Sequence, residues 1–443
     1  MTPRPQGAQG RGTVRSLMRG FRRDLLSALT ERLYDAWMAE FKSPLIHSFF
    51  CNDPNLLRVI LQERPQDFPK SARMREGLAP LLGNGVFISE GEDWARQRRI
   101  IDPAFEGGRL RHSYPAILQA AEAAAGRLAP GPVDVEPHAA HAAADVIFRS
   151  LFSIPVDQGI AAEVFAAFRQ HQEAQPLVNL AAVLPWPRWL PRPHSRRTRT
   201  TAARIRGLIA ALVEDRRAQI AAGRAPQDLA TKIMTTPDPV TGRCFTPAEM
   251  VDQVAVLFLA GHETSASVLA WALWLLADHP EWQDRVAEES VGLTPDFACL
   301  SGMTATRAVF REALRLYPAV AMFAREAAGP ERFRDRDVPR GAQLTVSPWH
   351  LHRHRRLWDR PDVFDPGRWQ TEAGKASARR AYLPFSAGPR ACPGAGLAMV
   401  EGVVMLAAIT GRWRMEVTAD RPMPVARLTI RARDGIRLTL TPR

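Results

Sequence analysis

The sequence predicts a mainly α-helical protein with a small β-rich lobe. Between residue 14 and about residue 330, apolar positions recur with the 3.6-residue period of helices, and clusters of Pro and Gly separate the periodic stretches. From 331 to 370 and again from 413 to 443, short alternating runs such as AQLTVSP and VARLTIRA indicate strands. With 443 residues, of which 46% are hydrophobic, the chain is long enough to bury a large core.

The chain is predicted to form one domain, residues 21–443, behind a disordered basic tail, residues 1–20. The first 23 residues are basic and rich in Gly and Pro, and they contain no apolar stretch long enough for a signal peptide or a membrane span. The Pro- and Trp-rich run at 184–194 is interpreted as a loop over a mobile lid. We therefore expect a soluble, cytoplasmic monomer, with a peripheral membrane contact of the tail left open.

The formal net charge of +13 raises the question of nucleic-acid binding, which the sequence does not favour. Only four of the 59 basic residues are lysine, and the arginines are scattered along the chain. No basic stripe interleaved with aromatic residues and no zinc-finger or helix-turn-helix signature is present in the sequence. An acidic protein partner or a weak membrane-surface contact explains the charge better.

The four cysteines are far apart in sequence and argue against disulfides and against a cysteine zinc site, so a reducing compartment is expected. One of them, Cys392, stands in FSAGPRACPG, residues 385–394, before a helical pattern expected from Pro393 to about Thr410. The positive end of that helix and the free N–H groups of the loop are expected to lower the pKa of the thiol. A thiolate held in this way is a nucleophile or a metal ligand, whereas a single cysteine taken without its setting is more often a buried or idle thiol.

The clearest helix is predicted from the capping box TPAE, residues 246–249, to about Ala277. It would be about 45 Å long at ~1.5 Å per residue and is apolar nearly all round, so it should be buried. Its middle nevertheless reads AGHETS, residues 260–265. Polar groups at the centre of a buried helix usually serve function, and two ionisable ones argue against a membrane span.

Three further patterns are ambiguous when each is taken alone. EALR, residues 312–315, places Glu and Arg at i and i+3, a spacing that by itself favours an exposed ion pair. WARQR, residues 94–98, is compatible with a stacked surface pair. His350, His352 and His354 alternate as on a strand, but a metal site is not favoured because no clear carboxylate or cysteine ligand accompanies them.

Taken together and in order, these motifs resemble the cytochrome P450 family over nearly the whole chain. FSAGPRACPG matches the family's cysteine loop, and EALR matches its Glu-x-x-Arg pair. FDPGRW, residues 364–369, matches the segment whose arginine completes a buried charge network, and WARQR matches the Trp-x-x-x-Arg pattern. The resemblance implies the cytochrome P450 fold, haem b as cofactor and O2 as co-substrate.

The resemblance also implies a role for each matched residue. Cys392 is expected to ligate the haem iron, and Thr264 and Glu263 to deliver protons, with the Ala260–Gly261 pair permitting a local loosening of the helix. The residues expected to bind the cofactor are Trp94, Arg98, Ala260, Arg325, Phe385, Arg390, Cys392 and Gly394, with Gly388 allowing the loop to approach closely. The buried charge network would be Glu312, Arg315 and Arg368. The residues expected over the substrate are Phe87, Ile88, Val256, Val320 and Phe323.

A monooxygenase that hydroxylates or epoxidises a lipophilic molecule is therefore expected, with a terpenoid, carotenoid, fatty acid or aromatic compound as substrate. No dinucleotide fingerprint follows the cysteine loop, so electrons from NAD(P)H are expected through a ferredoxin and its reductase. The ferredoxin would meet Arg96, Arg99, Arg379 and Arg380. A haem-thiolate gas or ligand sensor is the alternative from another class, but it would need no proton relay. A cysteine hydrolase lacks a nucleophile motif.

Overall fold

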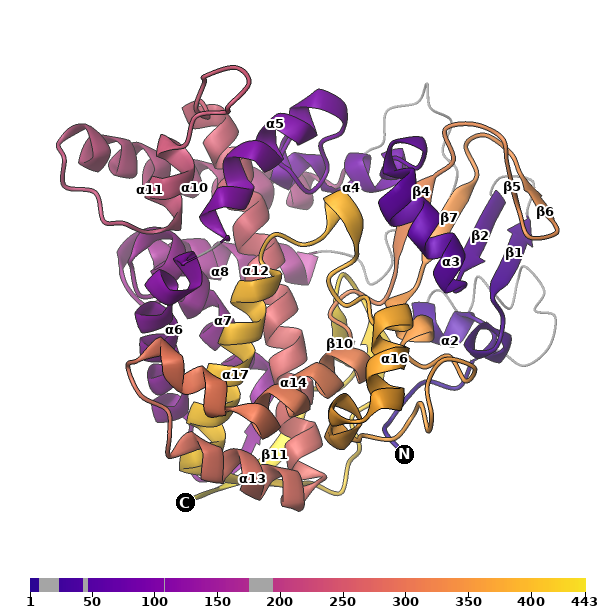
Figure 1. Ribbon diagram of the computed structural model, residues 1–443. Coiled ribbons are helices and arrows are strands. Elements are labelled where there is room, and N and C mark those ends of the chain that lie inside the picture. Colours follow the sequence, from indigo (N-terminus) through magenta and orange to yellow (C-terminus); the bar gives the residue numbers. More distant parts are fainter. Residues whose placement is uncertain (8–23, 43–46, 107, 175–193) are drawn as a thin grey trace.

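The computed structural model describes residues 1–7, 24–42, 47–106, 108–174 and 194–443, and it is dominated by helices (Figure 1). The helices are α2 (Leu25–Ala28), α3 (Pro54–Arg58), α4 (Ala72–Leu82), α5 (Gly91–Ile101), α6 (Arg109–Arg127), α7 (Val135–Phe152), α8 (Gly159–Ala174), α10 (Arg196–Ala221), α11 (Leu229–Thr235), α12 (Pro247–Ala277), α13 (Pro280–Ser290), α14 (Thr304–Leu316), α15 (Pro348–Leu351), α16 (Glu372–Ala381) and α17 (Ala395–Arg412). The strands are β1 (Met38–Lys42), β2 (His47–Cys51), β3 (Gly131–Asp134), β4 (Phe323–Glu326), β5 (Glu331–Phe333), β6 (Arg336–Val338), β7 (Gln343–Val346), β8 (Trp413–Val417), β9 (Pro424–Ala426), β10 (Ile430–Ala432) and β11 (Arg437–Pro442).

Helix α12 forms the centre of the helical body, as its composition predicts. It begins at a capping box in which Thr246 Oγ1 accepts from the N–H of Glu249 and the Glu249 carboxylate accepts from the N–H of Thr246. It runs 31 residues to Ala277 and packs against α7, α10, α14 and α17. Helices α12 and α17 are both long and apolar enough to cross a membrane, but most of each is buried within the protein, as expected of core helices.

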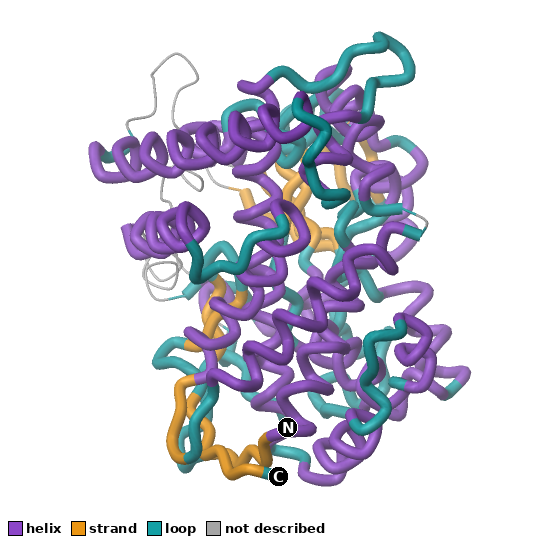
Figure 2. Tube along the Cα trace, turned by 90° about the vertical axis from the view of Figure 1, so that its left-hand side faces the viewer, coloured by secondary structure: helices purple, strands orange, loops and turns teal. Residues whose placement is uncertain are grey.

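The strands form small separate sheets beside the helices (Figure 2). The largest has the order β1-β2-β7-β4, in which β2 pairs parallel to β7 and the other pairs are antiparallel. Strands β1 and β2 lie where the sequence predicted mostly helix. The prediction was wrong there because the central residues of β2, Ser48 and Phe49, are both buried, so no alternation of apolar and polar residues identifies the strand.

The β-rich lobe is also shorter in sequence than predicted. Strands β5, β6 and β7 occupy residues 331–346, but the chain then forms α15 and a 3₁₀ turn, Pro366–Gln370, instead of further strands. Strands β8 to β11 fall within the second predicted β region, 413–443.

Part of the predicted N-terminal tail contacts the body of the protein. The N–H and Oγ1 of Thr2 both donate to the carbonyl oxygen of Asp362, and Arg4 forms ion pairs with Glu31 and Asp362. Residues 8–23 and most of the run at 184–194 lie outside the described residues. The interpretations of those segments, as a disordered tail and as a lid loop, therefore stay predictions.

Candidate active site

The loop before α17 is built so that Cys392 lies close to neighbouring backbone. The N–H of Cys392 donates to the carbonyl oxygen of Phe385 over 2.9 Å. Gly388 has a φ of +71°, and a Cβ at that position would lie 1.9 Å from the carbonyl oxygen of Leu61. Only glycine fits there, because a side chain would meet both the backbone strain and the steric clash. The helix itself starts at Ala395, two residues after the predicted start.

The thiol of Cys392 is accessible, yet it is closely surrounded by protein. Burial raises its pKa, while a hydrogen bond from the N–H of Gly394 and the charge of Arg98 lower it. The expectation of a lowered pKa was wrong for the chain alone, because desolvation outweighs the loop donors and the helix end. A side chain that is both accessible and enclosed lines a hollow, and a metal ion bound there would deprotonate the thiol.

A cluster of cations surrounds the ring of Trp94 on α5. The guanidinium carbons of Arg98 and Arg390 lie 6.0 and 5.4 Å from the ring centroid, and the Nζ of Lys70 lies 6.0 Å from it. Arg98 also donates to the carbonyl oxygen of Ala391 over 2.7 Å, so α5 is tied directly to the cysteine loop. The backbone of Arg325 on β4 pairs with that of Lys70 in an isolated antiparallel β-bridge.

The carboxylates near this cluster are too few to balance it. Arg390 pairs with Glu90 at 2.6 Å and Arg98 with Asp102 at 2.7 Å. Within the described residues Arg325 makes no ion pair, and burial together with the charge of Arg390 lowers its pKa to about 10. Burial is also the main reason why the pKa of Lys70 falls to about 7.

This excess of positive charge fits haem, whose two propionates would neutralise Arg325 and Lys70, beside a thiol able to bind its iron. The sequence predicted Arg98, Arg325, Arg390 and Trp94 as cofactor contacts but missed Lys70. The only signal was that Lys70 is one of four lysines in an arginine-rich chain.

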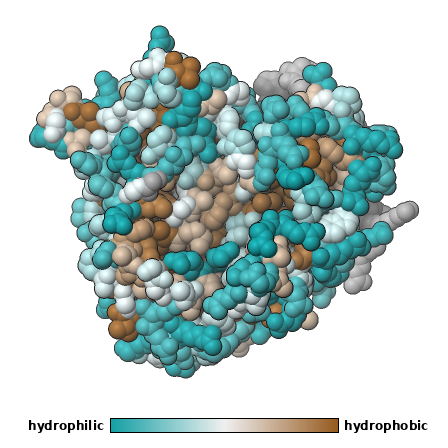
Figure 3. All heavy atoms as spheres, in the orientation of Figure 1, coloured by the Kyte–Doolittle hydropathy of each residue, from teal (hydrophilic) through white to brown (hydrophobic). Residues whose placement is uncertain are grey.

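One face of α12 remains accessible although the rest of this helix is buried. The accessible positions from 254 to 277 are Leu257, Ala260, Gly261, Thr264 and Ser265, and we call them the α12 stripe. Their spacing places them on one side of the helix. Since α12 crosses the core, an accessible stripe in its middle means that it lines a hollow. Figure 3 shows hydrophobic residues gathered in a hollow at the centre of one face of the molecule.

Thr264 belongs to the α12 stripe, and its Oγ1 donates to the carbonyl oxygen of Ala260. The helix is regular through Ala260 and Gly261, so the loosening that the sequence permits is not present. Glycine is needed at position 261 for close helix packing instead, because a Cβ there would lie 2.4 Å from Ile147 Cδ1 on α7.

Glu263 does not lie on the α12 stripe but points to a different side of the helix. It is buried, accepts from Gln172 Nε2 at 3.0 Å and from Thr429 Oγ1 at 3.3 Å, and lies 4.0 Å from Arg431. Burial raises the pKa of Glu263. The acid and the alcohol expected to act together are therefore adjacent in sequence but face different elements.

The charge network predicted from EALR and FDPGRW is present and enclosed. Arg315 donates to both carboxylate oxygens of Glu312, at 3.0 and 2.8 Å, and Arg368 Nε donates to Glu312 Oε1 at 2.9 Å. The side chains of Glu312 and Arg315 are both 0% exposed. An ordinary surface pair is excluded, and the network fastens α14 to the segment that leads to the cysteine loop.

The five residues predicted over the substrate differ in exposure. Phe87 is 40% exposed, and Val320 and Phe323 are half-buried. Ile88 and Val256 are buried, and a Cβ at Gly85 would lie 2.5 Å from Val256 Cγ2. Phe87, Val320 and Phe323 are therefore the better candidates for a substrate contact.

His350 and His352 are buried and hydrogen-bonded within the protein. His350 Nδ1 lies 2.8 Å from Ser347 Oγ, and the N–H of Leu383 donates to His352 Nε2 over 2.9 Å. Burial lowers the pKa of both rings to about 3. In the part of the chain that is described, no group of three or more metal-binding side chains occurs.

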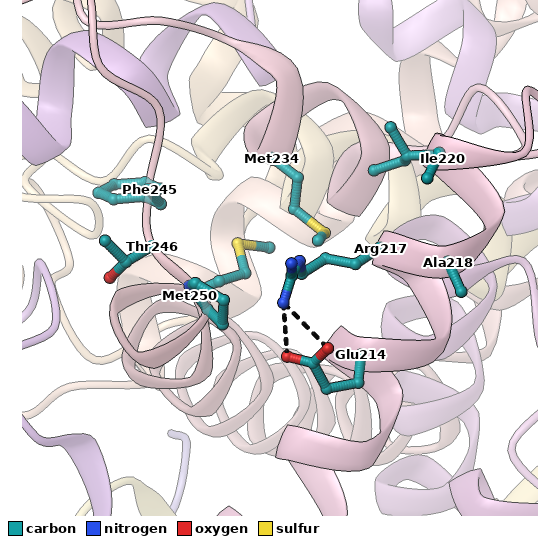
Figure 4. A pocket seen from close by; sticks show the side chains of 10 residues that line it. Glu214, Arg217, Ala218, Ile220, Met234, Phe245, Thr246 and Met250 are labelled. Carbon is teal, nitrogen blue, oxygen red and sulfur yellow. Dashed lines mark hydrogen bonds and ion pairs between the residues drawn. The ribbon is translucent and has the colours of Figure 1, made fainter.

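A cavity of about 430 Å³ lies elsewhere, between the end of α10, α11 and the start of α12 (Figure 4). Arg217 points into it and pairs with Glu214, between Met234 and Met250. None of the active-site residues predicted from the sequence lines this cavity, and no cysteine lines it. It is therefore not the candidate active site.

Comparison with known proteins identifies the family of the chain. The family model described as Cytochrome P450 matches residues 27–435. The chain is 34% identical over 405 residues to cyclooctatin synthase from Streptomyces melanosporofaciens, covering 88% of this chain and 84% of that protein. It is 31% identical over 397 residues to pentalenene oxygenase from Streptomyces avermitilis, covering 88% and 87%.

Solved structures share the fold. The cytochrome P450DA haem domain superposes with a TM-score of 0.81 at 24% identity, covering 100% of this chain and 98% of that one. A six-coordinated cytochrome P450 from Thermus thermophilus gives a TM-score of 0.67 at 24% identity, covering 89% and 92%. With the family model matching most of its length, the chain belongs to the cytochrome P450 family and is a haem-dependent monooxygenase, which uses O2 and electrons that redox partners supply from NAD(P)H.

Proposed function

We propose that this monooxygenase oxidises a terpenoid at the hollow between the cysteine loop and the α12 stripe. The observation that carries the proposal is that Cys392 and the stripe are accessible, and that the side chains of the stripe are small or apolar apart from Thr264 and Ser265. Such a wall suits a lipophilic molecule. Relatives named cyclooctatin synthase, cyclooctat-9-en-7-ol 5-monooxygenase and pentalenene oxygenase favour a terpenoid over a carotenoid, fatty acid or aromatic compound.

Haem, when bound, supplies the oxygen activation and one-electron chemistry. Cys392 holds the iron, and its sulfur accepts a hydrogen bond from the N–H of Gly394. Arg98, Arg325, Arg390 and Lys70 hold the propionates, and Trp94 lies among them. Binding of the propionates raises the pKa of Lys70 again, because anions next to the amine favour its charged form.

Thr264 Oγ1 holds a proton at the wall of the hollow, and burial raises the pKa of Glu263 in the adjacent buried network. Thr264→Ala is expected to bind haem and substrate and yet to divert electrons into hydrogen peroxide, whereas Thr264→Ser, which keeps a hydroxyl, restores the product yield. Equal product per NAD(P)H in wild type and Thr264→Ala would refute the role of Thr264. A sensor function finds no support in the relatives named above.

The ferredoxin proposed as electron donor would dock through Arg379 and Arg380 on α16. Both are exposed, and neither makes an ion pair within the described residues. The other two arginines expected at this face are engaged, since Arg96 pairs with Glu249 and Arg99 with Asp238 and Glu92. The proposed docking surface is therefore narrower than the sequence suggested. We also propose that the protein is a monomer in the cytoplasm.

Spectral titration of the purified protein tests the substrate class. The panel is cyclooctat-9-en-7-ol, pentalenene, a long-chain fatty acid and a cytokinin, each added to the oxidised haem-loaded protein. We expect at least one of the two terpenoids to bind about tenfold more tightly than the fatty acid and the cytokinin, a difference of about 1.4 kcal/mol. A fatty acid or cytokinin that binds more tightly than both terpenoids would contradict the terpenoid proposal.

A further inference from the structure

The loop of residues 83–90, which joins α4 to α5 and which we call the Phe87 loop, is fastened to α12 by two hydrogen bonds. The N–H of Asn84 donates to Asp252 Oδ2 over 2.8 Å, and the N–H of Val86 donates to Gln253 Oε1 over 2.9 Å. Gln253 is 0% exposed and lies about one helical turn before Leu257, the first residue of the α12 stripe. The loop therefore covers α12 just before the stripe becomes accessible.

The Phe87 loop fits so closely against α12 that it needs two glycines. Gly83 has a φ of +56°, and a Cβ there would clash with the Asp252 carboxylate. A Cβ at Gly85 would lie 2.9 Å from the carbonyl oxygen of Asp252. Because a side chain at either position would push the loop away from the helix, the glycines and Asp252 together define where the loop lies.

Asp252 also connects this loop to a third element, α10. Arg206 Nη2 lies 2.7 Å from Asp252 Oδ1, and Arg206 Nη1 donates to the carbonyl oxygen of Leu81 over 3.1 Å. The side chain of Asp252 is only 15% exposed. A hydrogen bond from a backbone N–H to a carboxylate is stronger than one between neutral groups, so Asp252 is the firmest attachment of the loop.

The loop presents one aromatic side chain outward. Phe87 is 40% exposed, whereas its neighbours Val86 and Ile88 are 8% and 1% exposed. Lys70, a proposed propionate contact, donates through Nζ to the carbonyl oxygens of Val86 and Ser89, at 2.9 and 3.1 Å. The loop therefore extends from the proposed cofactor contacts to the start of the α12 stripe, and Phe87 projects from it.

We propose that Asp252 is a positioning residue that fixes the Phe87 loop, so that Phe87 forms a rigid wall of the hollow and decides which molecular shape fits. The inference rests on the proposed function, because it concerns the same hollow. Asp252 acts through the loop and does not touch the substrate. A compact terpenoid then meets a ring that is already in place, and binding does not have to order it. Once the loop is loosened, the terpenoid loses this fit and a flexible chain gains room.

The simpler interpretation is that Asp252 only stabilises the fold. Asp252→Ala removes the acceptor, and α12 should tolerate it because alanine favours a helix more than aspartate does. Asp252→Asn keeps an oxygen that can accept from Asn84 and is the conservative variant. The matched control is Asp134→Ala. Asp134 likewise accepts from the N–H of a distant segment, Ile436 at 3.1 Å, beside a glycine of positive φ, but it caps the start of α7.

The test is a spectral titration of the haem-loaded protein with pentalenene and with the long-chain fatty acid, and its readout is the ratio of the two dissociation constants. Phe87→Ala and Asp252→Ala should each shift this ratio about fivefold in favour of the fatty acid, the scale of one aromatic contact. Asp252→Asn should keep most of the wild-type ratio, and Asp134→Ala all of it. A loss of stability alone would lower the amount of haem-loaded protein without changing the ratio.

An unchanged ratio in Asp252→Ala would overturn the proposal, and so would an equal shift in Asp252→Asn or Asp134→Ala. The double variant Phe87→Ala/Asp252→Ala tests the route. If Asp252 acts through Phe87, the double variant has the ratio of Phe87→Ala alone, whereas additive shifts would show that Asp252 acts elsewhere and would overturn the proposal.

The titration also separates this inference from the terpenoid proposal. If the wild type binds the fatty acid more tightly than both terpenoids, the terpenoid proposal fails, but a shifted ratio in Asp252→Ala still supports the positioning role. If the wild type prefers a terpenoid and Asp252→Ala has the same ratio, only the positioning role fails.

Discussion

Arg98 donates from Nη1 to the carbonyl oxygen of Ala391 over 2.7 Å, directly before the cysteine proposed to bind iron. The same guanidinium donates through Nε to Asp102. Arg98 therefore connects the helix that carries the proposed propionate contacts with the loop that carries the thiol.

Arg98→Lys is expected to weaken this connection, because a lysine cannot span the carbonyl and Asp102 with a fixed fork. We expect the free energy of unfolding to fall by about 2 kcal/mol, which is the scale of a hydrogen bond to a charged group. We also expect the protein to lose haem faster. Transfer of haem to excess apomyoglobin measures the rate. An unchanged transfer rate would show that Arg98 does not support the cofactor site.

The Glu312 network predicts a strong dependence of folding on Arg368. Arg368→Ala leaves Glu312 with one buried ion-pair partner instead of two, and breaking a buried pair costs about 3–5 kcal/mol. Arg360→Ala is the control in the same segment, since Arg360 is 61% exposed and its pair with Asp365 should contribute at most about 1 kcal/mol. Urea unfolding measures how much free energy of unfolding each variant loses. Equal losses in the two variants would contradict a special role for the buried network.

The low pKa of Lys70 predicts that the stability of the haem-free protein depends on pH. Its folded-state pKa of about 7 lies below that of an ordinary lysine, about 10.4, so the unfolded chain binds more protons between these values. The free energy of unfolding should therefore rise from pH 7 to pH 10. Lys70→Met should flatten this rise, and Lys375→Met, at an exposed site, should not. Haem should also flatten it, because the propionates raise the pKa of Lys70. Parallel melting curves of wild type and Lys70→Met at every pH would refute the prediction.

The docking proposal predicts that reversing Arg379 and Arg380 to Glu slows electron transfer from ferredoxin at low salt. The effect should fade as salt is added, since charge pairing at an exposed interface mainly raises the association rate. The double variant Arg196→Glu/Arg197→Glu on α10 changes the net charge by the same amount at another exposed pair. Equal slowing by both double variants would mean that net charge matters and that α16 is not the docking site.

Much of this account could be predicted from the sequence where the signal is local. The capping box defines the start of α12, and the family resemblance carried by EALR and FDPGRW predicts a charge network that is indeed buried. Side-chain direction was not predictable to the same degree. Glu263 and Thr264 are neighbours in sequence, yet only Thr264 lies on the α12 stripe.

What the sequence missed depends on contacts between distant segments. Lys70 pairs with Arg325, 255 residues further along the chain, through a single backbone β-bridge. Ser265 forms a hydrogen bond with Glu401, 136 residues further along. No motif marks either pair. The accessible thiol with a raised pKa also depends on the surrounding fold, because desolvation is set by the atoms packed around the loop.

The central claim is that Cys392 binds the haem iron through a thiolate. The most direct test is the absorption spectrum of the reduced, carbon monoxide-treated protein for wild type and Cys392→Ser, with Cys299→Ser as control. The account predicts the strongly red-shifted Soret band of thiolate ligation in wild type and in Cys299→Ser, and its loss in Cys392→Ser. A Soret band typical of imidazole ligation in wild type, or a red-shifted band that survives in Cys392→Ser, would contradict it.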